Sequence, residues 1–381
     1  MITRTLAGVL KKSRKSVLLL GPRQTGKSTL MQSLHPDLSI NLAHESTYLD
    51  FLRNPLELEQ RLSVQRNART VFVDEVQRLP SLLNTIQSLV DSKKENLRFL
   101  LTGSSARKLK RGHANLLPGR VHVYHLAPLS CSELGDSLST EKALAYGTLP
   151  GIWTDPSLSE AKKTLRSYAA TYLKEEVQAE NLARNLEGFA RFLHVAAAAS
   201  GQFLDLSKLA SLAQVPRQSA VRFFEILEDC LIVRRLEPFT SSSVRRLIQH
   251  PRFVFFDVGV LNGLLENFSV SADRRGGLFE QLVMTQIINE AAARDIEVRL
   301  STFRTEHGAE VDIIVERENQ ITAVEIKSAT TVDSSAYRGL KQFGDFLGKR
   351  HRSCIFYAGS VRKKINDVEL LPWQAGIREL F

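Results

Sequence analysis

The residues best suited to chemistry stand in one glycine-rich loop near the start of the chain, where residues 21–29 read GPRQTGKST. A loop with glycines, a lysine and a hydroxyl residue at these spacings cradles phosphate groups with its backbone N–H groups. The glycines let the backbone curl inward, the lysine reaches the β- and γ-phosphates, and the serine hydroxyl ligates Mg²⁺. The pattern predicts ATP and Mg²⁺ as cofactors. The predicted nucleotide-binding residues are Gly21, Arg23, Gln24, Thr25, Gly26, Lys27, Ser28 and Thr29.

Two carboxylates end an apolar run farther along the chain, at residues 70–75 (TVFVDE). Asp74 is predicted to hold the Mg²⁺ shell together with Ser28, and Glu75 to polarise the attacking water. With Lys27, these residues predict hydrolysis of ATP rather than binding alone. The alternative is an ordinary strand that ends in an acidic turn.

A third apolar run, FLLTGS at residues 99–104, ends in small polar residues. In a parallel sheet the end of this strand would lie beside the γ-phosphate, because ligands collect at the carboxyl edge. Thr102 and Ser104 are therefore candidate nucleotide sensors, and a simple turn is the alternative.

A second group of chemically able residues lies in GAEVDIIVERENQITAVEIKSA, residues 308–329. The spacing of Asp312 and Glu325 leaves room for an antiparallel hairpin that brings the two carboxylates together. Glu325 and Lys327 share one face of the second strand, because side chains alternate with period two. Two carboxylates can hold Mg²⁺ while a lysine orients or deprotonates a water for attack on a phosphodiester. A charged hairpin without chemistry explains the pattern about as well.

The elements that must position the first group alternate between strand and helix. Apolar runs at 16–20, 48–51, 70–74, 97–101 and 121–126 are separated by helix-like segments such as 81–91. This alternation predicts an α/β fold with a parallel sheet covered on both faces. Residues 146–156, rich in Gly, Pro and Asp, suggest a domain boundary.

The middle of the chain is predicted to be helical from residue 159 to about 199, followed by a winged helix-turn-helix. Residues 205–237 read as two short helices and a hairpin wing. Polar residues at the start of a recognition helix meet a DNA groove, although winged helices also serve as protein–protein modules. The candidate DNA contacts are Arg217, Gln218, Ser219 and Arg222 on the helix and Arg234 and Arg235 in the wing. Further basic residues are Arg107, Lys108, Lys110, Arg111, Arg245 and Arg246.

A second α/β domain is predicted from about residue 276 onward. It has a long helix at 278–293, strand-like runs at 297–302, 309–316, 321–327 and 353–357, and a helix at 335–347. The predicted domains are 1–150, 151–270 and 271–381.

Composition favours a globular protein with an anionic partner. Hydrophobic residues make up 43% and charged residues 24% of the chain, and 51 Lys and Arg against 41 Asp and Glu give a formal net charge of +10. Such an excess favours a polyanionic partner, either nucleic acid or an anionic membrane surface, although a solvated basic surface is the alternative. The apolar stretches fall short of the roughly 20 residues that span a bilayer, and the start of the chain does not read as a secretory signal, so no membrane and a cytoplasmic location are expected. Cys131, Cys230 and Cys354 are far apart and are expected to be reduced and structural.

Five segments carry a resemblance to a known family: GPRQTGKST, VFVDEVQRLP, LTGSSARKL, LPGRV and YGTLPG, in that order. They resemble the bacterial and archaeal AAA+-like ATPases in which a DUF4143 domain follows the AAA domain, and the resemblance covers nearly the whole chain. It implies a P-loop ATPase domain, a helical and winged-helix middle domain, and a restriction-endonuclease-like C-terminal domain. It also implies that Arg120 is an arginine finger acting on its own or a neighbouring subunit's nucleotide, which would make a homo-oligomer possible. A structural or DNA-contacting arginine is the alternative.

The carboxylate hairpin resembles the PD-(D/E)xK nuclease motif. The resemblance implies Glu280, Asp312, Glu325 and Lys327 as the catalytic set, with Asp312 and Glu325 as the metal ligands and Lys341 or Gln342 in an auxiliary position.

These features together predict an ATPase that couples turnover to binding or remodelling of duplex or branched DNA, in repair, recombination or defence. One alternative is a Mg²⁺-dependent DNA endonuclease regulated by ATP. The other is a nucleotide-dependent protein-interaction switch that is indifferent to DNA.

Overall fold

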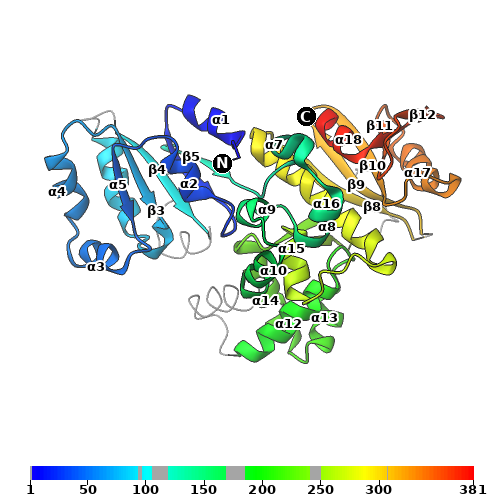
Figure 1. Cartoon of the computed structure of the whole chain (residues 1–381), viewed down its shortest axis with the longest axis horizontal. Helices are drawn as coiled ribbons and strands as arrows, with labels where there is room; N and C mark the ends of the chain where they lie inside the picture. The colour runs from blue at the N-terminus through cyan, green and yellow to red at the C-terminus, as the bar shows by residue number, and fades with distance from the viewer. Residues whose placement is uncertain (1, 93–96, 105–118, 169–184, 241–249, 307) are drawn as a thin grey trace. The chain divides into compact units, whose positions relative to one another are not determined.

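The computed structural model describes residues 2–92, 97–104, 119–168, 185–240, 250–306 and 308–381 (Figure 1). The chain divides into two compact units. One comprises Met1–Ala127 with the short segments Asp229–Leu231 and Ala292–Asp295, and the other comprises Pro128–Glu228, Ile232–Ala291 and Ile296–Phe381. Residues 128–150, which the sequence assigned to the first domain, belong to the second unit. The division into three domains stays a prediction.

The first unit is built on a parallel five-stranded sheet in the order β2-β3-β4-β1-β5. This confirms the predicted parallel sheet, and β4 lies between the strand that precedes the glycine loop and the strand that ends in the carboxylates. The carboxyl ends of parallel strands share one edge, so the loop and the carboxylates meet there. The strands are β1 (Ser16–Leu20), β2 (Leu38–Asn41), β3 (Thr70–Asp74), β4 (Arg98–Gly103) and β5 (Val121–His125).

Helices cover both faces of this sheet, because successive side chains of each strand point to opposite faces. Leu18 and Leu20 of β1 join one apolar cluster, while Val17 and Leu19 join the other. The first cluster includes residues of α3 (Glu45–Arg53), α4 (Glu57–Val64) and α5 (Leu82–Asp91). The second includes residues of α1 (Leu6–Lys12) and α2 (Lys27–Gln32).

One predicted strand of the first unit is wrong. Residues 48–51 form part of the helix α3, and the strand lies earlier, at β2. Tyr48 and Phe51, three residues apart, both pack against the same core cluster, which is helical spacing. Glu45 in the first turn and Arg53 in the last turn suit the helix dipole. A short apolar run does not by itself separate helix from strand.

Helices make up the first part of the second unit. The two helices of the predicted winged helix are present as α13 and α14, and the predicted helical region contains α10 and α12. The helices are α7 (Cys131–Leu134), α8 (Thr140–Tyr146), α9 (Pro150–Thr154), α10 (Leu158–Ser167), α12 (Leu186–Ala198), α13 (Leu206–Leu212), α14 (Arg217–Asp229) and α15 (Val258–Leu264).

The predicted hairpin wing is wrong, because both of its strands were placed within residues that form only one strand. The segment that follows α14 forms the single strand β6 (Val233–Pro238), and its antiparallel partner is β7 (Arg252–Phe255). The run LIVRRLEPF is too short for two strands, and its residues from Val233 onward pair with β7 as one strand. β6 also pairs with β8 in parallel, so this segment is part of a larger sheet.

That sheet has eight strands in the order β12-β13-β11-β10-β9-β8-β6-β7. The predicted strands and helices after residue 276 are confirmed. The hairpin of β9 and β10 pairs Val324 with Ile313, which brings Asp312 toward Glu325. The remaining elements are β8 (Arg299–Arg304), β9 (Glu310–Arg317), β10 (Gln320–Lys327), β11 (Arg352–Tyr357), β12 (Lys363–Ile365), β13 (Val368–Pro372), α16 (Ala272–Arg294), α17 (Tyr337–Leu347) and α18 (Trp373–Leu380).

All three cysteines are free and buried, in agreement with the expectation of structural thiols.

Candidate functional site

The glycine loop follows β1 directly, and its two motif glycines are required by the backbone. A Cβ atom on Gly21 would lie 2.2 Å from the carbonyl oxygen of Leu126, because β5 runs beside β1 up to this point. Gly26 has φ 89°, in the left-handed region that favours glycine. Any other residue at either position would force the loop to move.

Lys27 is buried and lies against the loop that it is predicted to serve. Its Nζ donates to the carbonyl oxygens of Gly21 at 2.8 Å and Pro22 at 2.9 Å. These neutral acceptors hold the ammonium at the concave side of the loop, where a phosphate would form a stronger, charge-assisted bond.

Arg4 also hydrogen-bonds to the backbone of the loop, a contact that sequence reasoning missed. Its two Nη atoms donate to the carbonyl oxygens of Thr25 and Ala127, each at 2.7 Å. Arg4 lies outside any motif, so only the fold shows that it reaches the loop.

The remaining loop residues differ in exposure. Thr25 is buried and its hydroxyl donates to the carbonyl oxygen of Pro22 at 2.9 Å. Gln24, with φ 62°, and Thr29 are exposed, and Arg23 is half-buried.

The structure brings Ser28, Asp74 and Thr102 together. The Ser28 hydroxyl donates to Asp74 Oδ1 at 2.9 Å, and the Thr102 hydroxyl donates to the same oxygen. Thr102 in turn accepts a bond from the backbone N–H of Glu75 at 3.1 Å. The two predicted Mg²⁺ ligands are therefore adjacent, as a shared metal shell requires.

Glu75 has an unusual backbone and a restrained side chain. Its φ is 56°, a left-handed conformation that is costly for a residue other than glycine. Gln77, which sequence reasoning missed, donates to the Glu75 carboxylate and also lies 3.0 Å from the Ser104 hydroxyl. Strain of this kind often marks functional positions.

Arg120 lies at the opposite edge of the sheet from the glycine loop. It precedes β5, whose first residue Val121 pairs with Ser16 at the start of β1, whereas the loop follows the end of β1. Its guanidinium binds both carboxylate oxygens of Asp91, at 2.6 and 2.9 Å. This register does not suit a contact with the nucleotide of its own chain. A finger that acts on a neighbouring subunit stays a prediction.

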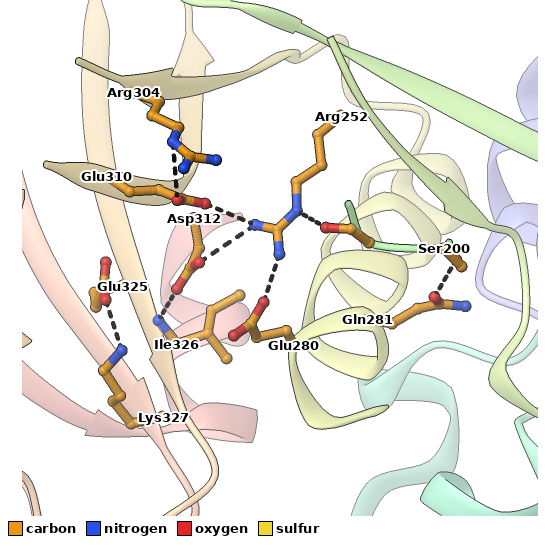
Figure 2. Close-up of polar contacts among 11 residues, drawn as sticks. Ser200, Arg252, Glu280, Gln281, Arg304, Glu310, Asp312, Glu325, Ile326 and Lys327 are labelled. Atoms are coloured by element: carbon orange, nitrogen blue, oxygen red, sulfur yellow. Dashed lines mark hydrogen bonds and ion pairs between the residues drawn. The ribbon is translucent and has the colours of Figure 1, made fainter. Parts of the chain in front are cut away.

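The second predicted group also converges (Figure 2). Glu280 comes from α16, Asp312 from β9, and Glu325 and Lys327 from β10. Asp312 Oδ2 accepts from the backbone N–H of Ile326 at 2.7 Å, and Lys327 Nζ lies 2.7 Å from Glu325 Oε1. Lys341 and Gln342 lie on α17, where Lys341 is exposed.

A residue that sequence reasoning missed, Arg252 of β7, lies among these carboxylates. Its Nη2 is 2.5 Å from Glu280 Oε2, and its Nη1 is 3.3 Å from Asp312 Oδ1 and 3.7 Å from Glu310 Oε1. Its Nε donates to the carbonyl oxygen of Gly201. Arg252 is 60 positions before Asp312 in the chain, too far for any spacing rule to link them.

Burial and charge crowding shape the electrostatics of this cluster. Burial, with the Asp312 carboxylate next, raises the pKa of Glu325 to about 8. The same two causes raise the pKa of Glu280 above its usual value. Burial pushes the pKa of Lys327 down, but its carboxylate neighbours, Glu325 first, raise it overall. Lys327 is therefore an ammonium at neutral pH, able to orient a water rather than to deprotonate it.

Most of the predicted DNA contacts are exposed to solvent, whereas one is bound to other groups of the protein. Arg217, Gln218, Arg222 and Arg234 are exposed, and Ser219 is half-buried. Arg217 also donates to the Ser207 hydroxyl at 3.1 Å.

Arg235, by contrast, is held by the protein itself. It pairs with Glu228 at 2.6 Å, and its guanidinium lies 5.2 Å from the centre of the Phe224 ring. The further basic residues Arg107, Lys108, Lys110, Arg111, Arg245 and Arg246 lie outside the described residues.

Family models match three successive parts of the chain. Residues 13–135 match an AAA domain, residues 138–271 match the domain of unknown function DUF8612, and residues 275–375 match the domain of unknown function DUF4143. The chain thus carries an AAA domain and a DUF4143 domain, as the motifs indicated.

Two curated relatives are uncharacterized proteins, Mb2031c of Mycobacterium bovis and Rv2008c of Mycobacterium tuberculosis. Each is 27% identical over 364 residues, which cover 92% of this chain and 78% of the relative.

Alignments to solved structures have low scores. A structure of Pif1 helicases at forked double-stranded DNA aligns with TM-score 0.26 and 12% identity over 49% of this chain and 59% of that chain. The replication initiator DnaA bound to AMPPCP and single-stranded DNA aligns with TM-score 0.25 and 12% identity over 58% of this chain and 85% of that chain. Protein VC1899 from Vibrio cholerae aligns with TM-score 0.23 and 13% identity over 96% of this chain and 97% of that chain. Such scores carry no argument about function.

Among the helices of the described residues, none combines the length and apolar character that a membrane crossing requires.

Proposed function

We propose that this protein hydrolyses ATP at the glycine loop and couples turnover to binding or remodelling of duplex or branched DNA. The observation that carries the first half is the 2.9 Å contact between Ser28 and Asp74 beside the buried Lys27. The match of residues 13–135 to an AAA domain supports the same activity.

The residues present fit a nucleotide with its metal ion. ATP with Mg²⁺ supplies a phosphoanhydride bond and a divalent charge that offsets charge on the phosphates. Lys27 would donate to phosphate oxygens in place of the carbonyl oxygens of Gly21 and Pro22. Ser28 and Asp74 would hold the metal shell. Glu75 would orient and polarise the attacking water once its hydrogen bond with Gln77 opens.

The DNA half of the proposal is supported by charge and exposure. The chain carries a net charge of +10, and α14 exposes Arg217 and Arg222 on a helix that follows another after a short turn. Exposed arginines bind phosphate oxygens and make affinity depend on salt.

Measurement of ATP turnover with and without duplex, single-stranded and branched DNA, at low and moderate salt, tests both halves. We expect Lys27→Ala to remove ATP binding and duplex or branched DNA to stimulate turnover of the unmodified protein. The matched control is Lys163→Ala, an exposed lysine of α10. Equal turnover in Lys27→Ala would end the ATPase proposal, and no stimulation with no DNA binding at low salt would end the DNA proposal.

A second candidate function, cleavage of a phosphodiester, is favoured by the convergence of Glu280, Asp312, Glu325 and Lys327. The carboxylates as they stand do not fit a divalent ion. Arg252 already binds Glu280 and Asp312, and within the described ranges no group of three or more His, Cys, Asp or Glu residues could hold a metal. We therefore derive no cleavage step from this arrangement.

A further inference from the structure

We infer that Arg252 is the resident cation of the carboxylate cluster and keeps that cluster closed to divalent metal ions. The inference goes beyond the proposed ATPase function. It concerns the regulation of the nuclease-like site, because a metal ion would need the oxygens that Arg252 now holds.

Arg252 occupies carboxylate oxygens that a metal ion would use. One guanidinium nitrogen binds Glu280 at 2.5 Å and another lies 3.3 Å from Asp312 Oδ1. The other Asp312 oxygen accepts the backbone N–H of Ile326 at 2.7 Å. Both oxygens of Asp312 and one of Glu280 thus have partners before any ion arrives.

Arg252 is also fixed in place by its hydrogen bonds. Its Nε donates to the carbonyl oxygen of Gly201, so its three guanidinium nitrogens are all engaged, as Figure 2 shows. The backbone around it is fixed as well. Leu204 N donates to the Pro251 carbonyl at 2.7 Å, and Gly201 N donates to the Phe253 carbonyl at 2.8 Å.

A contact next to Glu280 helps to fix the position of Glu280 relative to Arg252. Ser200 donates to the side chain of Gln281, the residue after Glu280 on α16, and also accepts from the backbone N–H of Phe255 at 3.3 Å. Figure 2 shows the Ser200–Gln281 contact beside the Arg252 ion pairs. The helix and the strand β7 therefore keep the carboxylate and the guanidinium together.

Electrostatic repulsion from Arg252 also disfavours a divalent ion at this cluster. Arg252 is 8% exposed and Asp312 is 8% exposed, so water screens their interaction weakly. A dication placed against Asp312 would face the fixed positive charge of Arg252 at close range, which is strongly unfavourable where screening is weak. Lys327 adds a second positive charge and is already paired with Glu325.

A cavity of about 370 Å³ adjoins partners of Arg252. It is lined by Gly201, Gln202, Phe203, Arg304 and Glu310. The Gly201 carbonyl oxygen accepts a hydrogen bond from Arg252 Nε, and Glu310 Oε1 lies 3.7 Å from Arg252 Nη1. Two partners of Arg252 therefore line this cavity.

The test is titration of the nucleotide-free full chain with Mn²⁺, followed by electron paramagnetic resonance. We expect no Mn²⁺ binding that depends on Asp312 in the unmodified protein, so Asp312→Asn leaves the titration unchanged. Arg252→Met is expected to bind Mn²⁺ about 10-fold or more tightly than the unmodified protein, and addition of Asp312→Asn should remove the gain. Circular dichroism confirms that each variant is folded.

Two outcomes would overturn the inference. One is Mn²⁺ binding by the unmodified protein that Asp312→Asn abolishes. The other is a folded Arg252→Met that binds no more Mn²⁺ than the unmodified protein. Arg252→Gln is the second variant, because it keeps a polar group against the carboxylates. If both variants unfold, Mn²⁺ binding by the unmodified protein that depends on Asp312 would still overturn the inference, and its absence would support it. ATP turnover, measured on the same samples, separates this result from failure of the ATPase proposal.

Discussion

At the scale of single residues, Asp74 has a crowded carboxylate. Ser28 and Thr102 both donate to its Oδ1, while Thr102 also accepts the N–H of Glu75. One hydroxyl thus links the predicted ligand of the Mg²⁺ shell to the residue that is predicted to polarise the attacking water. The role of Thr102 as a nucleotide sensor stays a prediction.

Gln77 is expected to restrain Glu75 in the resting state. It holds the Glu75 carboxylate and the Ser104 hydroxyl at once, so Gln77→Ala should free the carboxylate and raise ATP turnover without DNA by a few-fold. Glu75→Gln should retain ATP binding and lose about 10²-fold or more of its turnover, since removal of a general base costs that much. Steady-state phosphate release checks both. Unchanged or lower basal turnover in Gln77→Ala would show that the contact orients Glu75 rather than restrains it.

Glu325 should make stability depend on pH. Its pKa rises from the ordinary 4.5 to about 8 in the folded chain, chiefly through burial. The folded state therefore binds more protons at Glu325 than the unfolded state between these values. The contribution of Glu325 to stability is full below about pH 4.5 and is lost as pH rises toward 8.

The variant that tests this is Glu325→Gln, examined by urea unfolding between pH 5 and pH 9. It should flatten the slope and be more stable than the unmodified protein at the upper end, by on the order of 1 kcal/mol. Glu318→Gln, at an exposed position in the hairpin turn, is the control and should leave the slope unchanged. An equal slope in Glu325→Gln would contradict the assignment.

At the scale of elements, the contact between the end of β1 and the end of β5 sets the shape of the glycine loop. Gly21→Ala would place a methyl group 2.2 Å from the Leu126 carbonyl oxygen, a backbone atom that cannot rotate away. We expect loss of ATP binding and a fall in Tm.

Gly8→Ala is a matched control for that change, because a Cβ at Gly8 of α1 would meet nothing within 4 Å. It should leave ATP binding intact and raise stability by up to about 1 kcal/mol, from helix propensity. Differential scanning fluorimetry and nucleotide titration compare the two. ATP binding by Gly21→Ala with unmodified affinity would show that the loop can yield.

Periodicity and local motifs predicted most elements but not every contact. The strands of the parallel sheet other than β2, and those of the hairpin at Asp312, follow from apolar runs with clear ends. Residues 48–51 were placed wrongly, because a run of four residues suits both helix and strand. Arg252 could not be found, because β7 reaches α16 and β9 only through the folded sheet. Sequence spacing carries no information about such contacts.

At the scale of the whole molecule, the chain carries a net charge of +10. Some of its arginines are exposed to solvent, whereas others are paired with carboxylates of the protein. Arg217 and Arg222 are exposed on α14, whereas Arg235 is paired with Glu228. Arg217→Ala with Arg222→Ala should weaken DNA binding and lower the slope of log K against log salt by roughly one per lost phosphate contact.

Arg235→Ala is the matched control for DNA binding. It should lower stability through loss of the Glu228 pair and the Phe224 contact, with little change in the salt slope. Fluorescence anisotropy over a salt series distinguishes the two. An unchanged slope in the double variant would place the DNA contacts elsewhere.

The sharing of one eight-stranded sheet by β6, β7 and β9 has a consequence for cooperativity. The helices α13 and α14 lead directly into β6, which bonds to both β7 and β8. Separation of the helical part from the carboxylate part would break the pairing of β6 with β8, near one end of the sheet. Residues from Pro128 onward, apart from the short segments assigned to the first unit, should therefore melt as one cooperative block. Amide hydrogens of α14 and of β9 should then exchange with the same free energy of opening.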